Sequence, residues 1–350
     1  MQRILVTGGA GFIGSHTSLL LIEKGYEILI VDSLINSSIK LIKKINKIID
    51  IKFPKMKNKL TFIKGDLRDE TIVNEIFLNQ YKIGKPITGV IHFAGLKAVN
   101  ESIYEPLKYW DFNLVSTINL LKVMNLFDCR TIVFSSSAAV YGSPKKNFLK
   151  EEDKLDPINP YGLTKSTIEK ILDNLYKSSS NKWKIINLRY FNPIGAHTSG
   201  LIGEVPKGIP NNIFPLIMQV ASGNIEILKI YGNDWPTNDG TPIRDYIHVM
   251  DLANGHLYAL EHLLKNSSKI LNLNLGTGIG SSVLELIRTF EKVNKINVPF
   301  KFSHRRDGDA AIVVADNSLV KNILNWKPTR NIEDMCRDGW QWQRKNPNLF

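Results

Sequence analysis

Residues 7–14 read Thr-Gly-Gly-Ala-Gly-Phe-Ile-Gly, and this run has a spacing that could bind a phosphate group. Its glycines satisfy G-x-G-x-x-G, and Gly8, Gly11 and Gly14 also satisfy the related G-x-x-G-x-x-G. Glycines let the backbone turn tightly, approach a pyrophosphate without Cβ atoms in the way, and present the amides of a helix N-terminus to its charge. The run therefore predicts a dinucleotide-binding turn.

Asp32 makes this interpretation more specific. It stands 18 residues beyond Gly14, at the end of the second predicted strand. A carboxylate at that place accepts hydrogen bonds from the diol of an adenine ribose and repels a 2′-phosphate, which favours NAD over NADP. The alternative is a glycine-rich turn followed by an aspartate that only caps the chain.

A second group of residues could move a proton. Ser135-Ser136-Ser137 ends a predicted strand, and Tyr161 and Lys165 follow at helical i, i+4 spacing, which places them on one face of a helix. A phenol titrates near ~10, so a useful base needs its pKa lowered by roughly three units; the Lys165 ammonium and an oxidised nicotinamide could supply that change. Ser137 could orient the substrate oxygen or pass the proton. The alternative is an ordinary helix with Tyr161 on its buried side.

The elements that would position these groups alternate between strands and helices. Short β-branched runs predict strands over 4–7, 28–32, 61–66, 90–94, 131–135 and 185–192. Segments of period 3.6 predict helices over 13–24, 69–81, 114–126 and 161–176. This order predicts an α/β fold, a doubly wound parallel sheet of the Rossmann type with helices on both faces. Ligands of such folds lie at the carboxyl ends of the strands, where both groups fall.

The pattern changes after residue 192 to Pro- and Gly-rich connections around short elements, with loops that carry too little core to fold alone. We interpret residues 1–192 as an NAD-binding Rossmann domain and residues 193–350 as mostly a smaller C-terminal substrate-binding lobe. A segment around 245–275 is expected to return to the first domain, with its strand over 270–275 in the main sheet.

Composition excludes several classes of protein. The 350 residues are 43% hydrophobic and 22% charged, which is typical of a globular chain and excludes disordered and fibrous ones. Cys129 and Cys336 are too few for a disulfide scaffold or a zinc cluster, and no metal site is expected. The N-terminus carries no signal peptide and no window is long and apolar enough to span a membrane, so we expect a cytoplasmic protein without a membrane partner.

The net charge of +12 is concentrated in a lysine-rich segment over residues 36–60. Its isoleucines recur at near-helical spacing, which predicts an amphipathic surface helix with a solvated lysine face. A nucleic-acid site would need interleaved aromatic residues and arginines, and Phe53 alone is present, so no nucleic-acid partner is expected. The role of this segment stays open.

Several strings together resemble the extended short-chain dehydrogenase/reductase family, and within it the UDP-glucose (UDP-galactose) 4-epimerases. The resemblance extends from Ile4 to about Trp342. Its most specific strings are Gly-Phe-Ile-Gly-Ser-His (11–16), Ile-His-Phe-Ala-Gly-Leu-Lys-Ala-Val (91–99), Arg-Tyr-Phe-Asn-Pro (189–193), Gly-Ile-Pro-Asn-Asn (208–212), Arg-Asp-Tyr-Ile-His-Val-Met-Asp (244–251) and Arg-Arg-Asp-Gly-Asp (305–309).

The resemblance implies an NAD cofactor, a UDP-sugar substrate, a role in galactose metabolism and a homodimer. Tyr161 would be the proton acceptor, Lys165 its activator and Ser137 the assisting hydroxyl. The implied cofactor contacts are Gly8, Gly11, Phe12, Ile13, Gly14, Asp32, Asn36, Ser37, Asp66, Leu67, Phe93, Ala94, Lys97, Asn113, Tyr161, Lys165 and Phe191. The implied substrate contacts are Ser137, Tyr161, Asn192, Asn212, Ile213, Tyr231, Arg244, Arg306, Asp309 and Val313.

Three departures from the family pattern stand out. Ser33 follows Asp32 where many epimerases have Asn, and the lysine-rich segment lengthens the loop after the second strand. Val313 occupies a position where members confined to the non-acetylated sugars carry Tyr. A smaller side chain leaves room beside the 2-position of the sugar, so we expect UDP-N-acetylglucosamine and UDP-N-acetylgalactosamine to be interconverted as well.

Two other functions remain as alternatives. A nucleotide-sugar 4,6-dehydratase shares the fold, NAD and the Tyr/Lys pair, but that family places an Asp-Glu pair after the residue corresponding to Ser137. This chain has Ala138-Ala139, and neither side chain can transfer a proton. The other alternative is a non-catalytic NAD-binding scaffold, although such proteins typically lose the Tyr or the Lys.

Overall fold

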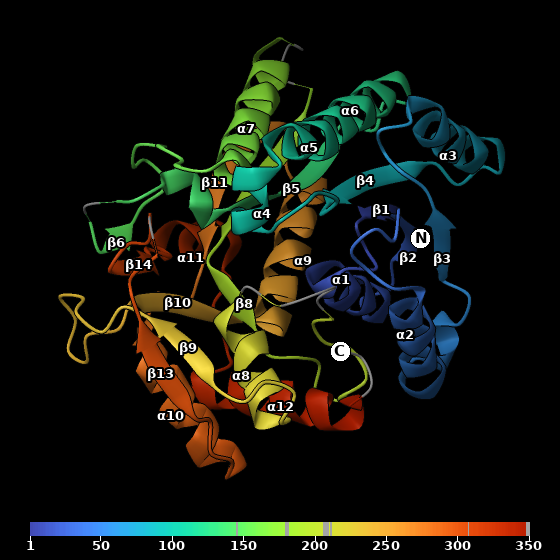
Figure 1. Cartoon of the computed structure of the whole chain (residues 1–350). Coiled ribbons are helices and arrows are strands. Elements are labelled where there is room, and N and C mark those ends of the chain that lie inside the picture. The colour runs from blue at the N-terminus through green and yellow to red at the C-terminus, as the bar shows by residue number, and fades with distance from the viewer. Residues whose placement is uncertain (145, 179–181, 206–209, 211, 307, 348–350) are drawn as a thin grey trace.

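The main layer of the protein is a seven-stranded parallel sheet (Figure 1). The computed structural model describes residues 1–144, 146–178, 182–205, 210, 212–306 and 308–347. The strand order is β11-β7-β5-β4-β1-β2-β3. The strands are β1 (Arg3–Thr7), β2 (Glu27–Asp32), β3 (Leu60–Lys64), β4 (Ile87–His92), β5 (Thr131–Ser137), β7 (Lys184–Tyr190) and β11 (Lys269–Leu275).

Helices cover both faces of this sheet, which confirms the predicted doubly wound α/β fold. One face packs against α1 (Phe12–Glu23), α2 (Ile39–Lys52), α9 (Val249–Lys265) and α11 (Ser318–Leu324). The other packs against α3 (Glu70–Lys82), α6 (Ser116–Leu126) and α7 (Pro160–Ser178). The inner strands β1, β2, β4, β5 and β7 are rich in Ile, Leu and Val and are buried on both sides, whereas the edge strand β3 is partly exposed. The sheet is therefore a rigid platform for the loops at its carboxyl edge.

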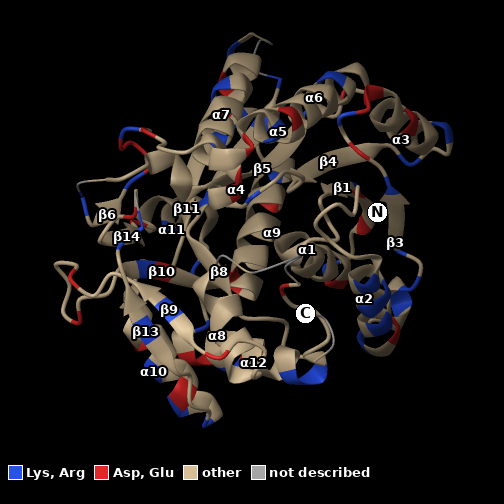
Figure 2. Ribbon diagram, viewed as in Figure 1, with Lys and Arg blue, Asp and Glu red and all other residues tan. Residues whose placement is uncertain are grey.

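The lysine-rich segment forms the helix that its spacing predicts. The Ser38 hydroxyl accepts a hydrogen bond from the Lys40 amide and caps α2, and Ile42, Ile45 and Ile48 are buried. Four of the five lysines of α2 are exposed, and Lys44 binds Asn346. Figure 2 shows the lysines gathered on this helix. A 3-10 turn, η1 (Pro54–Met56), leads on to β3. The segment is thus part of the packed α/β layer.

The second half of the chain has more structure than its loops indicate. A five-stranded sheet contains the path β12-β10-β14-β6 with β8 paired to β10, and β13 pairs with β9. These strands are β6 (Phe148–Leu149), β8 (Asn192–Ile194), β9 (Leu228–Tyr231), β10 (Ile243–His248), β12 (Gly280–Ser282), β13 (Phe300–Ser303) and β14 (Ile312–Ala315). Helices α8 (Ile213–Ala221), α10 (Val283–Asn294) and α12 (Ile332–Lys345) pack there in a separate hydrophobic cluster. Apolar residues far apart in sequence meet in this cluster. The expectation that the second half cannot fold alone stays a prediction.

Short helical elements connect the strands on the side of the predicted site. They are α4 (Val99–Tyr104), α5 (Pro106–Trp110), the π-helical turn η2 (Asp111–Val115) and the 3-10 turn η3 (Ala138–Tyr141). Across the described residues, every helix is too short or too polar to cross a bilayer.

Candidate active site

A cavity of about 1230 Å³ lies at the carboxyl ends of the main-sheet strands, between the sheet and the elements of the second half. With the exception of Asn113, all of the residues that the sequence analysis assigns to cofactor, catalysis or substrate line this one cavity. They lie at the ends of β1, β2, β3, β4, β5 and β7 or in the loops that follow these strands, and in the first turns of α1 and α7. The others come from β8, the N-terminus of α8, β9, β10, β14 and the loop before β14. The fold thus brings together residues that are spread along the sequence from Gly8 to Val313.

The glycine turn has the geometry of a phosphate cradle. Gly8 has a φ of +68°, and a Cβ on it would lie 2.7 Å from the Ala94 amide nitrogen. A Cβ on Gly14 would lie 2.5 Å from the Gly8 carbonyl oxygen. Gly11 caps α1 without a side chain, so the amides of the first turn face the cavity with no capping group in the described structure. These residues fit the diphosphate of a dinucleotide.

Asp32 is held in place before any ligand arrives. Its Oδ2 accepts a hydrogen bond of 3.0 Å from the Ala10 amide, and its Oδ1 accepts bonds from the Leu34 amide and from the Ser37 hydroxyl. The side chain is buried at 7% exposure but lines the cavity. Each carboxylate oxygen has two lone pairs, and Oδ2 accepts only one of these bonds, so Asp32 can still accept a hydrogen bond from a ribose hydroxyl. This acceptor therefore fits the adenine ribose of NAD.

Ser137, Tyr161 and Lys165 meet at one end of the cavity. Ser137 ends β5 and its Oγ accepts a hydrogen bond of 3.1 Å from the Ala139 amide. Tyr161 and Lys165 lie in the first two turns of α7, and the Lys165 Nζ donates a hydrogen bond of 2.7 Å to the Ser135 carbonyl. That ammonium lies 5.9 Å from the centre of the Tyr161 ring and 4.9 Å from that of Phe134. The three groups are positioned for proton transfer to a substrate in the cavity.

The electrostatics of this end depend on burial. Burial raises the pKa of Tyr161, while the Ser137 hydroxyl and the charge of Lys97 lower it. Burial lowers the pKa of Lys165 to about 7, against the smaller raising effect of Glu169. Without a bound cation, Tyr161 is therefore a weaker acid than a free phenol. A cationic cofactor ring placed beside Tyr161 would act in the opposite direction.

The opposite end of the cavity is basic. The Arg244 guanidinium is held by the carbonyl oxygens of Ile243 and Ala310 at 2.9 and 2.8 Å, and lies 3.7 Å from the Asp309 carboxylate. The Arg306 guanidinium stacks over the Tyr231 ring at 3.9 Å. Two guanidiniums facing one cavity suit a diphosphate, and Asp309 can accept from a sugar hydroxyl.

Strands of the second sheet form another part of the cavity wall. Val313 pairs with Arg244 in the ladder between β14 and β10, and Asn192 pairs with Tyr246 in the ladder between β8 and β10. Val313 also packs in a small cluster with Phe191. These neighbours place Val313 in the wall between the proton-transfer group and the basic end.

Asn113 lies apart from the other expected cofactor contacts, and its contact with the cofactor stays a prediction. It lies at 1% exposure behind the cavity wall, outside the set of residues that line the cavity. Its Oδ1 accepts a hydrogen bond of 2.7 Å from the Leu96 amide, and its Nδ2 donates to the Leu96 carbonyl and to the Thr164 hydroxyl. Its amide thus fixes the loop after β4, which carries the cofactor contacts. In the family strings, residues 208, 209, 211 and 307 lie outside the described residues.

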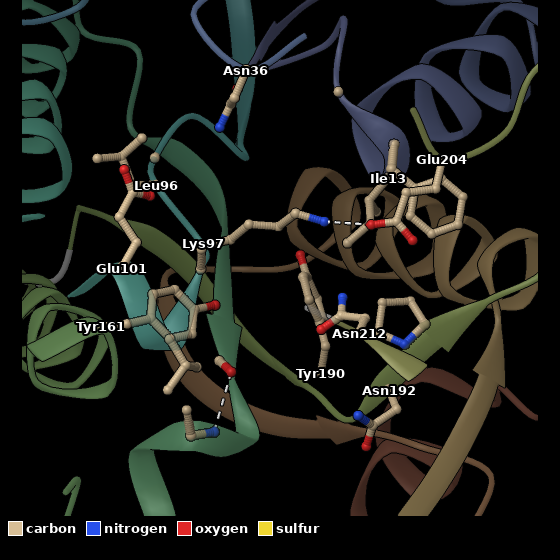
Figure 3. A pocket seen from close by; sticks show the side chains of 18 of the residues that line it. Ile13, Asn36, Leu96, Lys97, Glu101, Tyr161, Tyr190, Asn192, Glu204 and Asn212 are labelled. Carbon is tan, nitrogen blue, oxygen red and sulfur yellow. Dashed lines mark hydrogen bonds and ion pairs between the residues drawn. The ribbon is translucent and has the colours of Figure 1, made fainter. Parts of the chain in front are cut away.

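Two acidic residues of the cavity were not predicted from the sequence. Figure 3 shows Glu204 facing Lys97 across the cavity, and their Oε1 and Nζ atoms are 2.6 Å apart. Glu101 also lines the cavity and binds Lys108 and the hydroxyl of buried Tyr109. No short-range sequence pattern could indicate the Lys97–Glu204 pair, because the two residues are 107 positions apart.

Comparison with known proteins identifies close relatives over the whole chain. Residues 5–339 match the model of the family described as GDP-mannose 4,6 dehydratase. The chain is 49% identical over 349 residues to the UDP-glucose 4-epimerase of Bacillus subtilis (strain 168), covering 100% of this chain and 99% of that protein.

Two solved structures share the fold. One is UDP-glucose-4-epimerase from Stenotrophomonas maltophila with bound NAD and formylated UDP-arabinopyranose, with a TM-score of 0.93 and 42% identity over 100% of both chains. The other is UDP-glucose 4-epimerase from Bifidobacterium longum in complex with NAD+ and UDP, with a TM-score of 0.91 and 43% identity over 100% of both chains.

Proposed function

Because the chain belongs to the UDP-glucose 4-epimerases of the extended short-chain dehydrogenase/reductase family, we propose that it interconverts UDP-glucose and UDP-galactose with a bound NAD. The observation that carries this function is the single cavity that joins three groups: the phosphate cradle with Asp32, the proton-transfer group around Tyr161, and the basic end around Arg244. A dehydrogenase that releases its cofactor needs only the first two.

The reaction requires a proton acceptor beside carbon 4 of the sugar. Tyr161 takes the proton of the 4-hydroxyl, with the Ser137 hydroxyl orienting that oxygen or relaying the proton. Lys165, anchored on the Ser135 carbonyl, stands near both the phenol and the place of a cofactor ribose. NAD, when bound, supplies a hydride acceptor and donor at carbon 4.

Epimerisation further requires that the sugar turn over between two hydride transfers. Arg244 and Arg306 hold the diphosphate at one end, where forked hydrogen bonds give strong binding. The 4-keto sugar would then rotate about its link to the anchored diphosphate, carbon 4 would regain the hydride on its other face, and Tyr161 would return the proton to the 4-oxygen. The reaction therefore needs strong binding of the diphosphate and weak binding of the sugar, so that the sugar can turn while the substrate stays bound.

The acetylated sugars form the finer part of the proposal. Val313 lies in the cavity wall between Phe191 and Arg244, where a Tyr would fill more space. A wall with a smaller side chain leaves room for an acetamide group. Steric overlap between that group and a Tyr ring would cost about 1–3 kcal/mol. We therefore propose that UDP-N-acetylglucosamine and UDP-N-acetylgalactosamine are also substrates.

The matching family's description names a dehydratase, so that reaction needs a specific argument. Elimination of water from the sugar requires an acid and a base beside carbons 5 and 6. Ala138 and Ala139, which line the cavity directly after Ser137, supply neither. The epimerase is therefore the function we propose for this chain.

One assay tests the function. Purified protein is incubated with UDP-galactose, and separately with UDP-N-acetylgalactosamine, without added NAD, and products are separated by chromatography. We expect the corresponding gluco-sugar from each. Dehydrated 4-keto-6-deoxy product, or no product from a folded and NAD-loaded protein, would contradict the proposal.

The proposed function also leads us to propose a domain division, a cellular location and an oligomeric state. We assign residues 1–192, with the returning segment around 245–275, to cofactor binding and residues 193–350 mostly to substrate binding. The presence of α9 and β11 on the main sheet supports the returning segment. We also propose a cytoplasmic location, which the two buried free cysteines support, and a homodimer formed through α4, α5 and α7.

A further inference from the structure

Lys97 and Glu204 bridge the cavity where a cofactor would cross it. Lys97 lies in the loop after β4, and Glu204 lies between β8 and α8. Figure 3 shows the Lys97 side chain extended toward Glu204, beside Ile13 in the first turn of α1. All three residues line the cavity. The ion pair therefore connects a cofactor loop of the main sheet to a segment of the second half.

Glu204 is held in place by the packing of its neighbours. Ile202 is fully buried in the core that contains α1 and α9. Gly203 contacts the indole of Trp342 so closely that a Cβ would lie 2.5 Å from the ring. The Glu204 side chain is itself only 8% exposed. Its carboxylate cannot turn to solvent unless this packed segment shifts, so it needs a nearby cation.

Lys97 supplies that cation and has spare capacity. Its side chain is 57% exposed, and the exposed part faces the cavity. Burial alone would lower the pKa of Lys97, but the charge and hydrogen bond of Glu204 raise it above its usual value. An ammonium has three N–H donors, and Glu204 uses one of them. The others are available to a ligand in the cavity.

A dinucleotide placed with its adenine ribose on Asp32 and its nicotinamide beside Tyr161 must run past the N-terminus of α1. Its diphosphate then lies next to the amides of Gly11–Ile13 and next to the Lys97 ammonium. We propose that Glu204 is a positioning residue that holds Lys97 against the cofactor diphosphate, so that carboxylate, ammonium and phosphate form one bridge that retains NAD. This inference rests on the proposed NAD-dependent function and adds a residue to it.

The bridge has a consequence that simple packing lacks. If Lys97 is removed alone, the buried Glu204 carboxylate is left unpaired beside two phosphates and repels them. If both charges are removed, that repulsion disappears. The double variant should therefore retain NAD better than the Lys97 variant alone, whereas two independent structural losses would add.

The test measures the NAD that each purified protein releases on denaturation, and its release rate in excess of a competing NAD analogue. We expect release to be on the order of tenfold faster in Glu204→Gln and a hundredfold faster in Lys97→Met. Lys97→Met/Glu204→Gln should release NAD about tenfold more slowly than Lys97→Met, and Glu204→Asp should lie between wild type and Glu204→Gln. Glu70→Gln, which breaks an exposed pair with Lys122, is the matched control and should match wild type.

The outcomes separate the two proposals. Wild-type protein that folds but holds no NAD would contradict the proposed function. NAD-loaded wild type with a double variant that releases NAD as fast as Lys97→Met, or faster, would overturn the role of Glu204. Melting temperatures of the NAD-free forms show whether any loss comes from unfolding.

Discussion

Replacing Tyr161 by Phe removes one hydroxyl and leaves a ring of nearly the same shape. We expect Tyr161→Phe to keep its fold and bound NAD but to lose turnover by about 10²–10⁴-fold, because only the proton acceptor is missing. The measurement is single-turnover conversion of UDP-galactose by NAD-loaded protein. Retention of more than about a tenth of wild-type turnover would show that another group is the base.

Lys165 should act on the same proton through charge. The pKa of Lys165 is lowered to about 7 by burial, so its ammonium is present mainly below that pH in the cofactor-free protein. A cation near the phenol stabilises the phenolate and lowers the pKa of Tyr161. Lys165→Met should therefore lose activity and shift the rising limb of the pH–rate profile to higher pH. A limb that stays in place would contradict this role.

Val313 should control which sugars react. We expect wild-type protein to turn over both the acetylated and the non-acetylated pair, and Val313→Tyr to lose mainly the acetylated pair, because the ring would fill the space of the acetamide. The measurement is kcat/KM for both pairs in both proteins. Absence of acetylated turnover in wild type, or an unchanged ratio in the variant, would contradict the proposal.

Some of the site residues could be predicted from the sequence and others could not. Asp32, Tyr161 and Lys165 have local spacings that follow from chemistry. Glu204 has none, because its partner is 107 residues away and the contact depends on packing against Trp342. The role of Asn113 as a cofactor contact rests on the family resemblance and stays a prediction; the structure shows its amide bound to the backbone of Leu96.

At the scale of elements, the exposed lysines of helix α2 and the turn after it can be replaced to test whether their charge affects turnover. Lys43, Lys47, Lys55 and Lys57 are exposed on α2 and on the turn that follows it. Replacing these four by Gln should leave turnover within about twofold, since exposed charges more than ~8 Å from a site are screened at physiological salt. Lys44 is left intact because it binds Asn346. A tenfold fall with the fold intact, or salt-sensitive binding of nucleic acid by wild type, would contradict this.

The main-sheet strands of the first half and helices α1, α2, α3, α6 and α7 were predictable because each follows from a local pattern. Boundaries differ where tertiary contacts decide them. The predicted strand over 185–192 ends at Tyr190, and the chain then enters the second sheet as β8 (Asn192–Ile194), which pairs with β10. The short β6 (Phe148–Leu149) exists only because β14 pairs with it, so no local pattern could indicate it.

At the scale of the whole molecule, packed elements and an ion pair join the two halves of the chain, in addition to the covalent connection between them. Helix α9 and strand β11 come from the second half of the sequence and complete the main sheet. Segment 202–204 connects in the other direction, since it packs on α1 and α12 and presents Glu204 to Lys97. The cavity therefore lies between parts of the chain that are held together by covalent, packing and ionic links.

The face formed by α4, α5 and α7 carries the remaining whole-molecule prediction. These three helices pack on one another, and they expose Ile103, Tyr104 and Leu107, the last two at 83% and 81%. Large apolar side chains gathered on a surface indicate a protein interface, and a twofold axis lets one patch bind its own copy. We expect wild-type protein to be a dimer in light scattering and Leu107→Glu to have the 39.6 kDa mass of one chain, because each buried Glu would face an apolar surface. Ile279→Glu, which changes an equally apolar residue that is 70% exposed elsewhere, should remain dimeric. A monomeric wild type, or a dimer that persists in Leu107→Glu, would place the interface on another face.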